Sequence, residues 1–357
     1  MNTVDKGFED TSVTQIASFS RNVIMKVEQA LEQFLAKATL ISETEKVATQ
    51  NSLGRVLAEE IHSGFDVPGV DNSAMDGYAI HLADLEQSGD RRLKLSQTVP
   101  AGAPVLNFKR GSCARIFTGA PLPIGADTVI PQEACLVEDD WITFPAEIRV
   151  GANIRLRGEE LHKGEQLLSQ GHKIRAQELG LLATLGVAEV SVVRPLRIAI
   201  FSTGDELTPL GQPLQAGRIY DSNRYILMSL LQSLGHQVVD LGTVADQHQA
   251  TCDTLTQAAQ QADLIITSGG VSVGDEDHVK NAVAELGHID AWRIAIKPGK
   301  PLAYGEVKGV PFFGLPGNPV ATFITFCLFV RPYLMKMQGI QQLAPQILMF
   351  PATFSRK

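Results

Sequence analysis

Beyond Pro195 the sequence alternates short apolar runs with longer amphipathic segments, and this alternation limits the possible folds more than any other feature. The first runs are buried-strand patterns, "LRIAIFS", "QVVDLGTV" and "DLIITS", and segments with helical periodicity lie between them. Strands that alternate with helices form a parallel or mixed sheet that helices cover on both faces. We therefore expect an α/β domain over residues 195–340, ending in a long apolar helix over residues 319–337.

Polar residues and glycines gather in the turns that follow the expected strands. In open α/β sheets, ligands bind beyond the carboxyl ends of the strands, where such turns meet. Glycine lets backbone N–H groups approach phosphate oxygens, lysine adds positive charge, and carboxylates hold a hard divalent cation. The turns therefore predict a site for a phosphorylated ligand with a divalent metal ion. They read "STGDEL", "VADQHQ", "SGGVSVGDED", "IKPGKP" and "LPGNP".

Each turn taken alone also has an ordinary structural interpretation. A single "SGG" is more often a tight turn, "KPGKP" an exposed loop, and Asp246 a helix N-cap. Asp205 or Glu206 could equally compensate a helix dipole. The hypothesis of a site therefore depends on the conjunction of all these turns at one sheet edge.

The first half of the chain is organised differently. Residues 19–37 have the periodicity of an amphipathic helix, and residues 175–186 have that of a second helix rich in Ala and Leu. Short strand signals lie between them, and one economical arrangement pairs the two helices in a domain that the strands interrupt. The expected domains are a discontinuous helical linker and dimerisation domain over residues 1–55 and 155–194, an inserted mostly-β domain over residues 56–154, the α/β domain over residues 195–340, and a further segment over residues 341–357.

Length, charge and cysteine content exclude several classes of protein. A chain of 357 residues exceeds the size at which one core keeps growing, so several domains are expected. The formal net charge of -8 argues against a nucleic-acid-binding surface, which would be basic. The N-terminus lacks the apolar run of a signal peptide and we find no stretch of about 18 apolar residues, so we expect a cytoplasmic protein with no membrane span. The four cysteines match no metal or redox motif and are expected to be reduced and buried.

Eight segments stand out along the chain. They read "DVPGVDNSAMDGYA", "TGAPLPIGADTVI", "NIRLRGEE", "STGDEL", "GRIYDSN", "SGGVSVGDEDHVK", "AIKPGKPLAYG" and "GLPGNPV". In this order they resemble the molybdopterin molybdenumtransferase family, which inserts molybdenum in the last step of molybdenum-cofactor synthesis and includes the E-type domain of gephyrin. The resemblance covers most of the chain, from about residue 20 to residue 340.

The resemblance implies a fold and a reaction. It implies a homodimer in which a helical domain is interrupted by a β domain and followed by a molybdopterin-binding α/β domain. The family takes molybdate and adenylylated molybdopterin as substrates, cleaves the pyrophosphate with Mg²⁺, and releases molybdenum cofactor and AMP. Its active site lies between the α/β domain of one subunit and the helical and β domains of the other. Molybdopterin adenylyltransferase and other proteins of cofactor synthesis are the implied partners.

The resemblance also implies roles for individual residues. Asp71 and Thr118 would face the ligand from the second subunit, and Glu160 stands where family members often have aspartate. The implied catalytic residues are Asp71, Glu206, Asp246 and Asp277, and the last three would also hold the magnesium ion. The implied substrate-binding residues are Thr118, Glu160, Ser268, Gly269, Gly270, Ser272, Gly274, Arg293, Lys297, Lys300, Pro316, Gly317 and Asn318.

Two features depart from the family pattern, and two other functions stay open. Arg293 stands where family members can have a lysine, which keeps the charge but changes hydrogen-bond geometry. The family also has a C-terminal β domain, and "ILMFPATF" is the expected start of one that this chain lacks for the most part. The alternatives are a molybdopterin adenylyltransferase, which would not need the N-terminal region, and a non-catalytic scaffold that binds molybdopterin.

Overall fold

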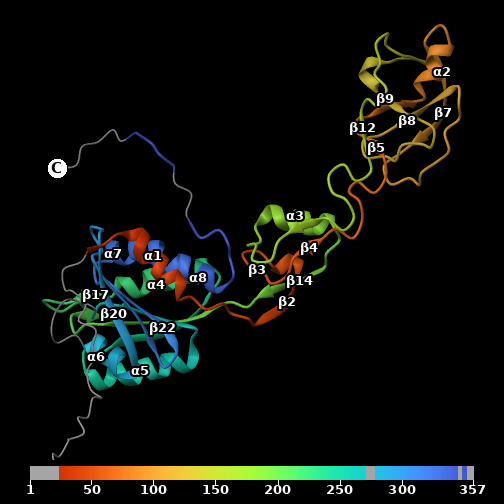
Figure 1. Cartoon of the computed structure of the whole chain (residues 1–357). Helices are drawn as coiled ribbons and strands as arrows, with labels where there is room; N and C mark the ends of the chain where they lie inside the picture. The colour runs from red at the N-terminus through yellow and green to blue at the C-terminus, as the bar shows by residue number, and fades with distance from the viewer. Residues whose placement is uncertain (1–23, 271–277, 345–347, 352–357) are drawn as a thin grey trace, which may run out of the picture. The chain divides into compact units, whose positions relative to one another are not determined.

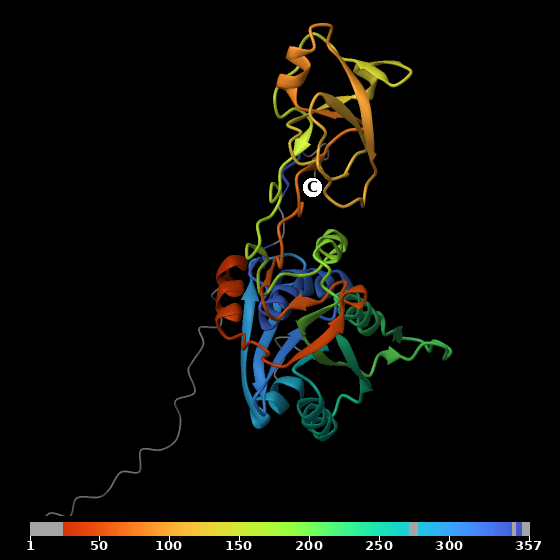
Figure 2. The same cartoon turned by 90° about the vertical axis from the view of Figure 1, so that its right-hand side faces the viewer.

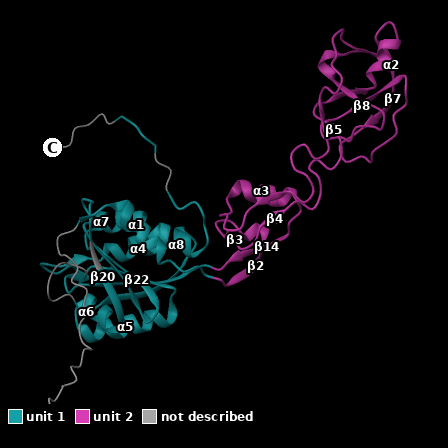
Figure 3. Cartoon of the chain, viewed as in Figure 1, with its two compact units in different colours: residues 1–41, 195–357 teal, residues 42–194 magenta. Residues whose placement is uncertain are grey.

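The protein divides into two compact units. The computed structural model describes residues 24–270, 278–344 and 348–351. Residues 1–41 and 195–357 belong to one unit, called the α/β unit below, and residues 42–194 belong to the other, called the inserted unit (Figure 3). The chain therefore leaves the α/β unit once and returns to it once. The four domain boundaries expected from the sequence remain a prediction.

A seven-stranded mixed sheet forms the centre of the α/β unit (Figure 1). Its strand order is β1-β20-β21-β22-β19-β15-β18, and β15, β18, β19 and β22 are parallel. β21 is antiparallel to both its neighbours. The expected mixed sheet is thus confirmed. The strands are β1 (Ile24–Met25), β15 (Arg197–Thr203), β18 (Gln237–Val244), β19 (Leu264–Ser268), β20 (Gly287–Ile294), β21 (Pro301–Val307) and β22 (Val310–Leu315), and a separate pair joins β16 (Leu207–Thr208) to β17 (Ile219–Tyr220).

Helices cover both faces of this sheet, as the alternating pattern predicts (Figures 1 and 2). Alternate residues of β15 point to opposite faces, so Ile198 and Ile200 enter one core while Ala199 and Phe201 enter the other. The first core also takes residues from α1 (Val27–Ala36), α4 (Ser222–Ser233), the π-helical segment Phe326–Val330 and α8 (Arg331–Met337). The second core is completed by α5 (His248–Gln261) and α6 (His278–Leu286).

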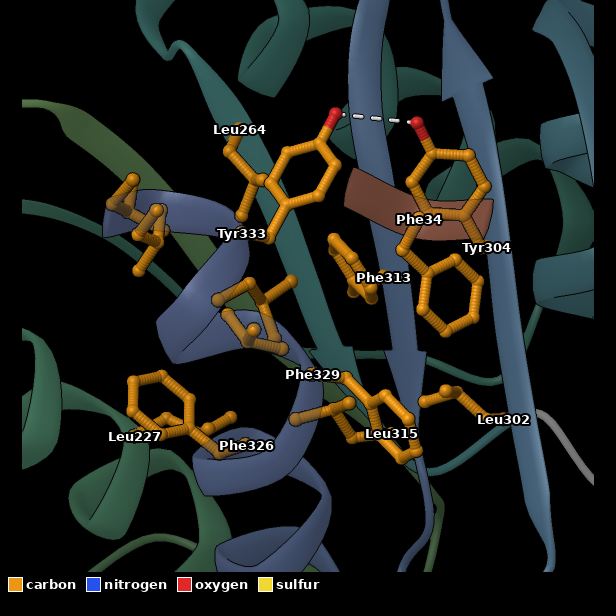
Figure 4. Packing of buried hydrophobic residues seen from close by; sticks show 14 of the residues in the cluster. Phe34, Leu227, Leu264, Leu302, Tyr304, Phe313, Leu315, Phe326, Phe329 and Tyr333 are labelled. Carbon is orange, nitrogen blue, oxygen red and sulfur yellow. Dashed lines mark hydrogen bonds between the residues drawn. The ribbon is translucent and has the colours of Figure 1, made fainter. Parts of the chain in front are cut away.

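Aromatic rings dominate the first core (Figure 4). Phe313 of β22 packs edge-on against Tyr304 and Tyr333, with ring centroids 5.1 Å apart in both pairs. The buried hydroxyl groups of Tyr304 and Tyr333 form a hydrogen bond of 3.2 Å with each other, so neither is left without a partner (Figure 4). This core fixes the strands whose turns form the candidate site.

The first helix belongs to the α/β unit. Phe34 of α1 is fully buried and lies 5.2 Å from the Tyr304 ring and 5.6 Å from the Phe329 ring, measured between centroids. The sequence had suggested pairing this helix with the one near residue 180, which lies in the inserted unit. The structure differs because an amphipathic pattern shows that a helix has an apolar face but does not identify what covers it.

One segment of the described chain, Pro319–Met337, is long and apolar enough to span a membrane, contrary to our expectation from the sequence. It consists of α7 (Pro319–Thr325), the π-helical segment and α8. Pro332 has no N–H to donate to the preceding turn, which gives a physical reason for the wider π segment directly before it. Phe326, Phe329 and Tyr333 are buried, so this segment is the core helix of the α/β unit.

A six-stranded sheet is the largest element of the inserted unit, and its strands are drawn in orange and yellow in Figure 2. Its order is β10-β11-β7-β8-β6-β9, in agreement with the short strand signals expected between the two helices of the first half of the chain. The strands are β6 (Gly77–Ile80), β7 (Arg92–Val99), β8 (Ser112–Ile116), β9 (Thr128–Pro131), β10 (Leu136–Glu138) and β11 (Trp141–Thr143), with the short helix α2 (Leu82–Gln87) after β6 and a 3₁₀ turn, Gln132–Ala134, after β9.

The rest of the inserted unit contains more strands than the sequence predicts. Helix α3 (Ala176–Thr184) is present as expected, and beside it lies a three-stranded sheet in the order β2-β14-β3. The segments that pair in this sheet lie far apart in the sequence, so their short apolar alternation gave no clear signal. The remaining elements are β2 (Thr44–Ala48), β3 (Val56–Leu57), β4 (Ile61–His62), β5 (Asn72–Ser73), β12 (Ile154–Arg155), β13 (Gln166–Leu168), β14 (Glu189–Val193) and the 3₁₀ turn Thr49–Asn51.

Candidate active site

The sheet topology brings five turns of the α/β unit to one edge, called the carboxyl edge below. β18, β15, β19 and β22 are parallel, so their carboxyl ends share that edge. Because β21 is antiparallel to both β22 and β20, β20 also ends there. Most of the site residues predicted in this unit lie in these turns. They are Glu206, Asp246, Gly269, Gly270, Lys297, Lys300, Pro316, Gly317 and Asn318, with Ser268 and Arg293 at the strand ends.

The turn after β19 requires glycine at two successive positions. Gly269 has φ +90°, and a Cβ there would lie 2.9 Å from the carbonyl oxygen of Thr203. Gly270 has φ +63°, and a Cβ there would lie 2.5 Å from Val279 Cγ2 and 2.7 Å from Thr203 Oγ1. A side chain at either position would meet both strain and a clash. The other residues predicted in this turn, Ser272, Gly274 and Asp277, lie outside the described residues.

Asn223 of α4 connects two of the turns. Its Nδ2 donates to Ser268 Oγ and to the carbonyl oxygen of Gly317, both at 2.7 Å. Asp221 caps the same helix by accepting a hydrogen bond from the backbone N–H of Arg224. Asn223 was missed by the sequence analysis, although the motif "GRIYDSN" that contains it was noted. The signal was the Asp-Ser-Asn sequence directly before a helical run.

Two acidic turns meet beside the glycine turn. The Asp205 carboxylate accepts a long hydrogen bond of 3.5 Å from the backbone N–H of Asp246, which links the turns after β15 and β18. Gly204 has φ +144°, and a Cβ there would lie 2.5 Å from Glu206 Oε2. Glu206 and Asp246 are both exposed. Two of the three carboxylates predicted to hold metal therefore lie at the carboxyl edge.

Buried hydroxyl groups also end at the carboxyl edge. Ser202 and Thr203 close β15, and Thr267 lies one residue before the end of β19. Their hydroxyl oxygens are buried without a hydrogen-bond partner among the described residues, as is Asn223 Oδ1. Buried polar atoms in folded proteins are nearly always paired, so this concentration of atoms without a described partner is unusual. The sequence analysis did not select these hydroxyls.

The basic residues and the last turn complete the carboxyl edge. Lys297 and Lys300 are exposed in the turn between β20 and β21, and Arg293 is exposed near the end of β20. Asn318 has a structural role as the N-cap of α7, because its Oδ1 accepts from the backbone N–H groups of residues 320 and 321 at 3.0 and 3.1 Å. Thr322 Oγ1 donates to the carbonyl oxygen of Pro316 at 2.6 Å and holds the same turn.

The three predicted residues of the inserted unit lie in one cluster of loops. β5 pairs with β12, and Ser73 exchanges backbone hydrogen bonds with Gly119 and Ala120. The loops around residues 71–76, 117–122 and 154–160 are therefore neighbours, and we call them the loop cluster. Asp71 Oδ1 accepts from the backbone N–H of Arg157 at 2.7 Å. The carboxylate of Glu160 is exposed, and its backbone N–H donates to the carbonyl of residue 67.

Asp76 fixes the position of Thr118. Asp76 lies in the motif "DVPGVDNSAMDGYA" but was not among the predicted site residues. The N–H and the Oγ1 of Thr118 both donate to Asp76 Oδ1 at 2.8 Å. These two hydrogen bonds hold the pKa of Asp76 below its ordinary value, so this carboxyl group is charged at neutral pH. The Thr118 hydroxyl group therefore donates its hydrogen bond to Asp76, and its oxygen can still accept a hydrogen bond from a ligand.

Comparison with known proteins matches both units of the chain. Residues 25–186 match the family described as MoeA N-terminal region (domain I and II), and residues 199–336 match the probable molybdopterin binding domain. The Haemophilus influenzae protein named molybdopterin molybdenumtransferase is 43% identical over 321 residues, which are 89% of this chain and 79% of that protein. A Nostoc protein of the same name is 40% identical over 84% of this chain and 70% of its own length.

A solved structure is similar over the same range. The crystal structure of the molybdopterin biosynthesis moeA protein from Pyrococcus horikoshii OT3 superposes with a TM-score of 0.76 at 31% identity. The match covers 90% of this chain and 81% of that one. Identity at this level, over most of both chains and with both domains matched, leads to one conclusion. This chain belongs to the molybdopterin molybdenumtransferase family.

Proposed function

We propose that this protein inserts molybdenum from molybdate into adenylylated molybdopterin and releases AMP. It is a molybdopterin molybdenumtransferase, a transferase of molybdenum-cofactor biosynthesis. The adenylylated form of the substrate and the release of AMP are parts of our proposal. The observation that supports the location of the reaction is the convergence of glycine, acidic and basic turns at the carboxyl edge.

The carboxyl edge offers groups suited to an anionic ligand. The glycine turn after β19 exposes backbone that no Cβ shields, so its N–H groups can approach phosphate oxygens closely. Lys297 and Lys300 add positive charge on the turn between β20 and β21. Breaking the pyrophosphate linkage leaves negative charge on the departing phosphate, and these two ammonium groups stabilise that charge.

The acidic turns fit a magnesium ion in their donor chemistry. Mg²⁺ prefers oxygen ligands and is usually bound through one or two carboxylates together with substrate phosphates. Glu206 and Asp246 provide two exposed carboxylates on turns that are linked by a hydrogen bond from the Asp246 backbone N–H to the Asp205 carboxylate. We propose that these residues, with Asp277, hold the ion. A bound Mg²⁺ would neutralise the charge that develops on the phosphate oxygens.

The loop cluster of the inserted unit supplies a second set of ligand-binding groups. The exposed carboxylates of Asp71 and Glu160 and the hydroxyl oxygen of Thr118 are the groups proposed to contact the substrate. We propose that the protein is a homodimer, in which the loop cluster of one subunit serves the other subunit's carboxyl edge. Sedimentation equilibrium checks this part separately, since a monomer at working concentration would contradict it.

The proposed function is tested by incubating the purified protein with adenylylated molybdopterin, molybdate and Mg²⁺. We expect molybdenum cofactor that activates a cofactor-free molybdoenzyme, together with one AMP for each cofactor formed. Tungstate and omission of oxyanion serve as comparison reactions. Adenylylated product formed from molybdopterin and ATP without molybdate would instead identify an adenylyltransferase. Substrate binding with neither cofactor nor AMP formed would identify a scaffold.

A further inference from the structure

A group of potential metal ligands lies between α5 and α6, and none of its members is among the predicted site residues. His248 and Cys252 are one helical turn apart on α5, and Glu285 is on the facing helix α6. Their ligand atoms all lie within 4.8 Å of one another. Sequence patterns alone do not reveal this group, because its third member lies more than thirty residues along the chain from Cys252.

The distances within this group match those of a tetrahedral metal site. His248 Nε2 lies 3.3 Å from Glu285 Oε2, and Cys252 Sγ lies 3.8 Å from either ring nitrogen of His248. Zinc bonds of about 2.3 Å to sulfur and about 2.0–2.2 Å to nitrogen and oxygen put tetrahedral ligands about 3.4 Å apart for N and O and about 3.6 Å apart for S and N. The two measured separations are therefore close to those of a tetrahedral site, and the separation between Cys252 Sγ and the Glu285 carboxylate is at most 4.8 Å.

The three residues differ in solvent exposure, as a metal site open to solvent on one side requires. The Cys252 residue is 7% exposed, whereas the side chains of His248 and Glu285 are 40% and 61% exposed. An ion would enter from solvent and keep one position for water. An ion pair between His248 and Glu285 would explain why these two side chains lie close together. It would not explain the position of the Cys252 thiol beside them.

We propose that His248, Cys252 and Glu285 bind a divalent transition-metal ion of the zinc class, with water as the fourth ligand. Thiolate, imidazole and carboxylate together favour such an ion over Mg²⁺, which prefers oxygen ligands alone. The bound ion joins α5 to α6 and stabilises their contact. This proposal does not rest on the proposed function, since none of its three ligands is a residue assigned to the reaction, although His248 begins α5 two residues after Asp246.

Binding of Co²⁺ as an optical probe tests the thiol ligand. Full-length protein without an affinity tag is stripped with a chelator and titrated with Co²⁺. We expect a near-ultraviolet thiolate-to-cobalt charge-transfer band that saturates at one equivalent and disappears in Cys252→Ser. Cys327→Ser is the matched control and should keep the band, because this cysteine lies on the opposite face of the sheet. Absence of the band in the unchanged protein, or its survival in Cys252→Ser, would overturn the proposal.

Binding of Zn²⁺ tests the other two ligands, His248 and Glu285. Both side chains are exposed, so the protein should tolerate their substitution. Competition with a chromophoric chelator measures the affinity, and His248→Gln and Glu285→Gln should each weaken it by about tenfold or more. The thermal midpoint should rise with Zn²⁺ in the unchanged protein and remain constant in His248→Gln. Equal affinities for the unchanged protein and both variants would refute the site even if Cys252→Ser fails to fold.

Discussion

At the scale of single residues, Asn223 is the clearest case of a side chain that organises the candidate site. It is buried, and its amide donates to Ser268 and Gly317 at once. The two acceptors belong to the turns after β19 and β22, so one side chain fixes the spacing between two walls of the carboxyl edge. This role was not visible in the sequence, because the acceptors lie 45 and 94 residues away and only folding brings them together.

Replacing Asn223 with Ala should destabilise the α/β unit by about 1–3 kcal/mol, because buried acceptors then lose their donor. Urea unfolding followed by circular dichroism measures the change. Asn281→Ala on the exposed face of α6 is the matched control and should be neutral or slightly stabilising, since Ala favours helix. Equal effects of the two substitutions would show that the bridging hydrogen bonds do not contribute.

Lys297→Ala should weaken binding of adenylylated molybdopterin by about tenfold at low ionic strength, because it removes a charged donor to phosphate oxygens. Isothermal titration calorimetry gives the affinity at several salt concentrations. Lys336→Ala, on α8 away from the turns, should leave the affinity unchanged. An unaltered affinity for Lys297→Ala at low salt would remove this lysine from the proposed site.

At the scale of elements, the sequence predicted the α/β unit well because its information is local and periodic. The alternating strands and helices imply a sheet whose parallel strands end at one edge, and this alone brings Glu206, Asp246 and Gly269 together. Three features could not be predicted in this way. They are the partner of α1, the Asp76–Thr118 hydrogen bonds and the buried hydroxyls of β15. Each depends on contacts between distant segments that leave no periodic signal.

Helix α3 illustrates an element whose start is held by an ion pair between an exposed arginine and a buried glutamate. Glu178 accepts hydrogen bonds from the Arg175 side chain, at 2.6 and 3.1 Å, and from the Arg175 backbone N–H at 2.9 Å. The Arg175 guanidinium is the main cause of a Glu178 pKa lowered from 4.5 to about 2, and burial opposes that shift. The contribution of this carboxylate to stability is therefore present above about pH 4.5 and is lost as the pH falls toward 2.

Acid titration of stability checks this expectation. Between pH 5 and pH 2, the unchanged protein should lose more unfolding free energy than Glu178→Gln, whose side chain does not titrate. Denaturant unfolding at stepped pH, followed by circular dichroism, gives the comparison. Parallel pH profiles for the two proteins would mean that the Glu178 carboxylate has the same pKa in the folded and unfolded chains.

At the scale of the whole molecule, the two sets of groups that we propose to bind substrate lie in two separately packed units. The carboxyl edge combines glycine turns, lysines and carboxylates, and the loop cluster adds Asp71, Thr118 and Glu160. Membership of the molybdopterin molybdenumtransferase family accounts for both sets with one reaction. The assignment of that reaction to the carboxyl edge remains the central claim.

The rate of molybdate-dependent AMP release in a matched pair of variants tests this claim most directly. Glu206→Gln removes an exposed carboxylate at the carboxyl edge, whereas Glu306→Gln removes one from β21 at the opposite edge of the same sheet. We predict a loss of about 100-fold or more for Glu206→Gln, as for other charged groups that act in a transition state, and an unchanged rate for Glu306→Gln. Equal rates for both variants and the unchanged protein would contradict the assignment of the reaction to this edge.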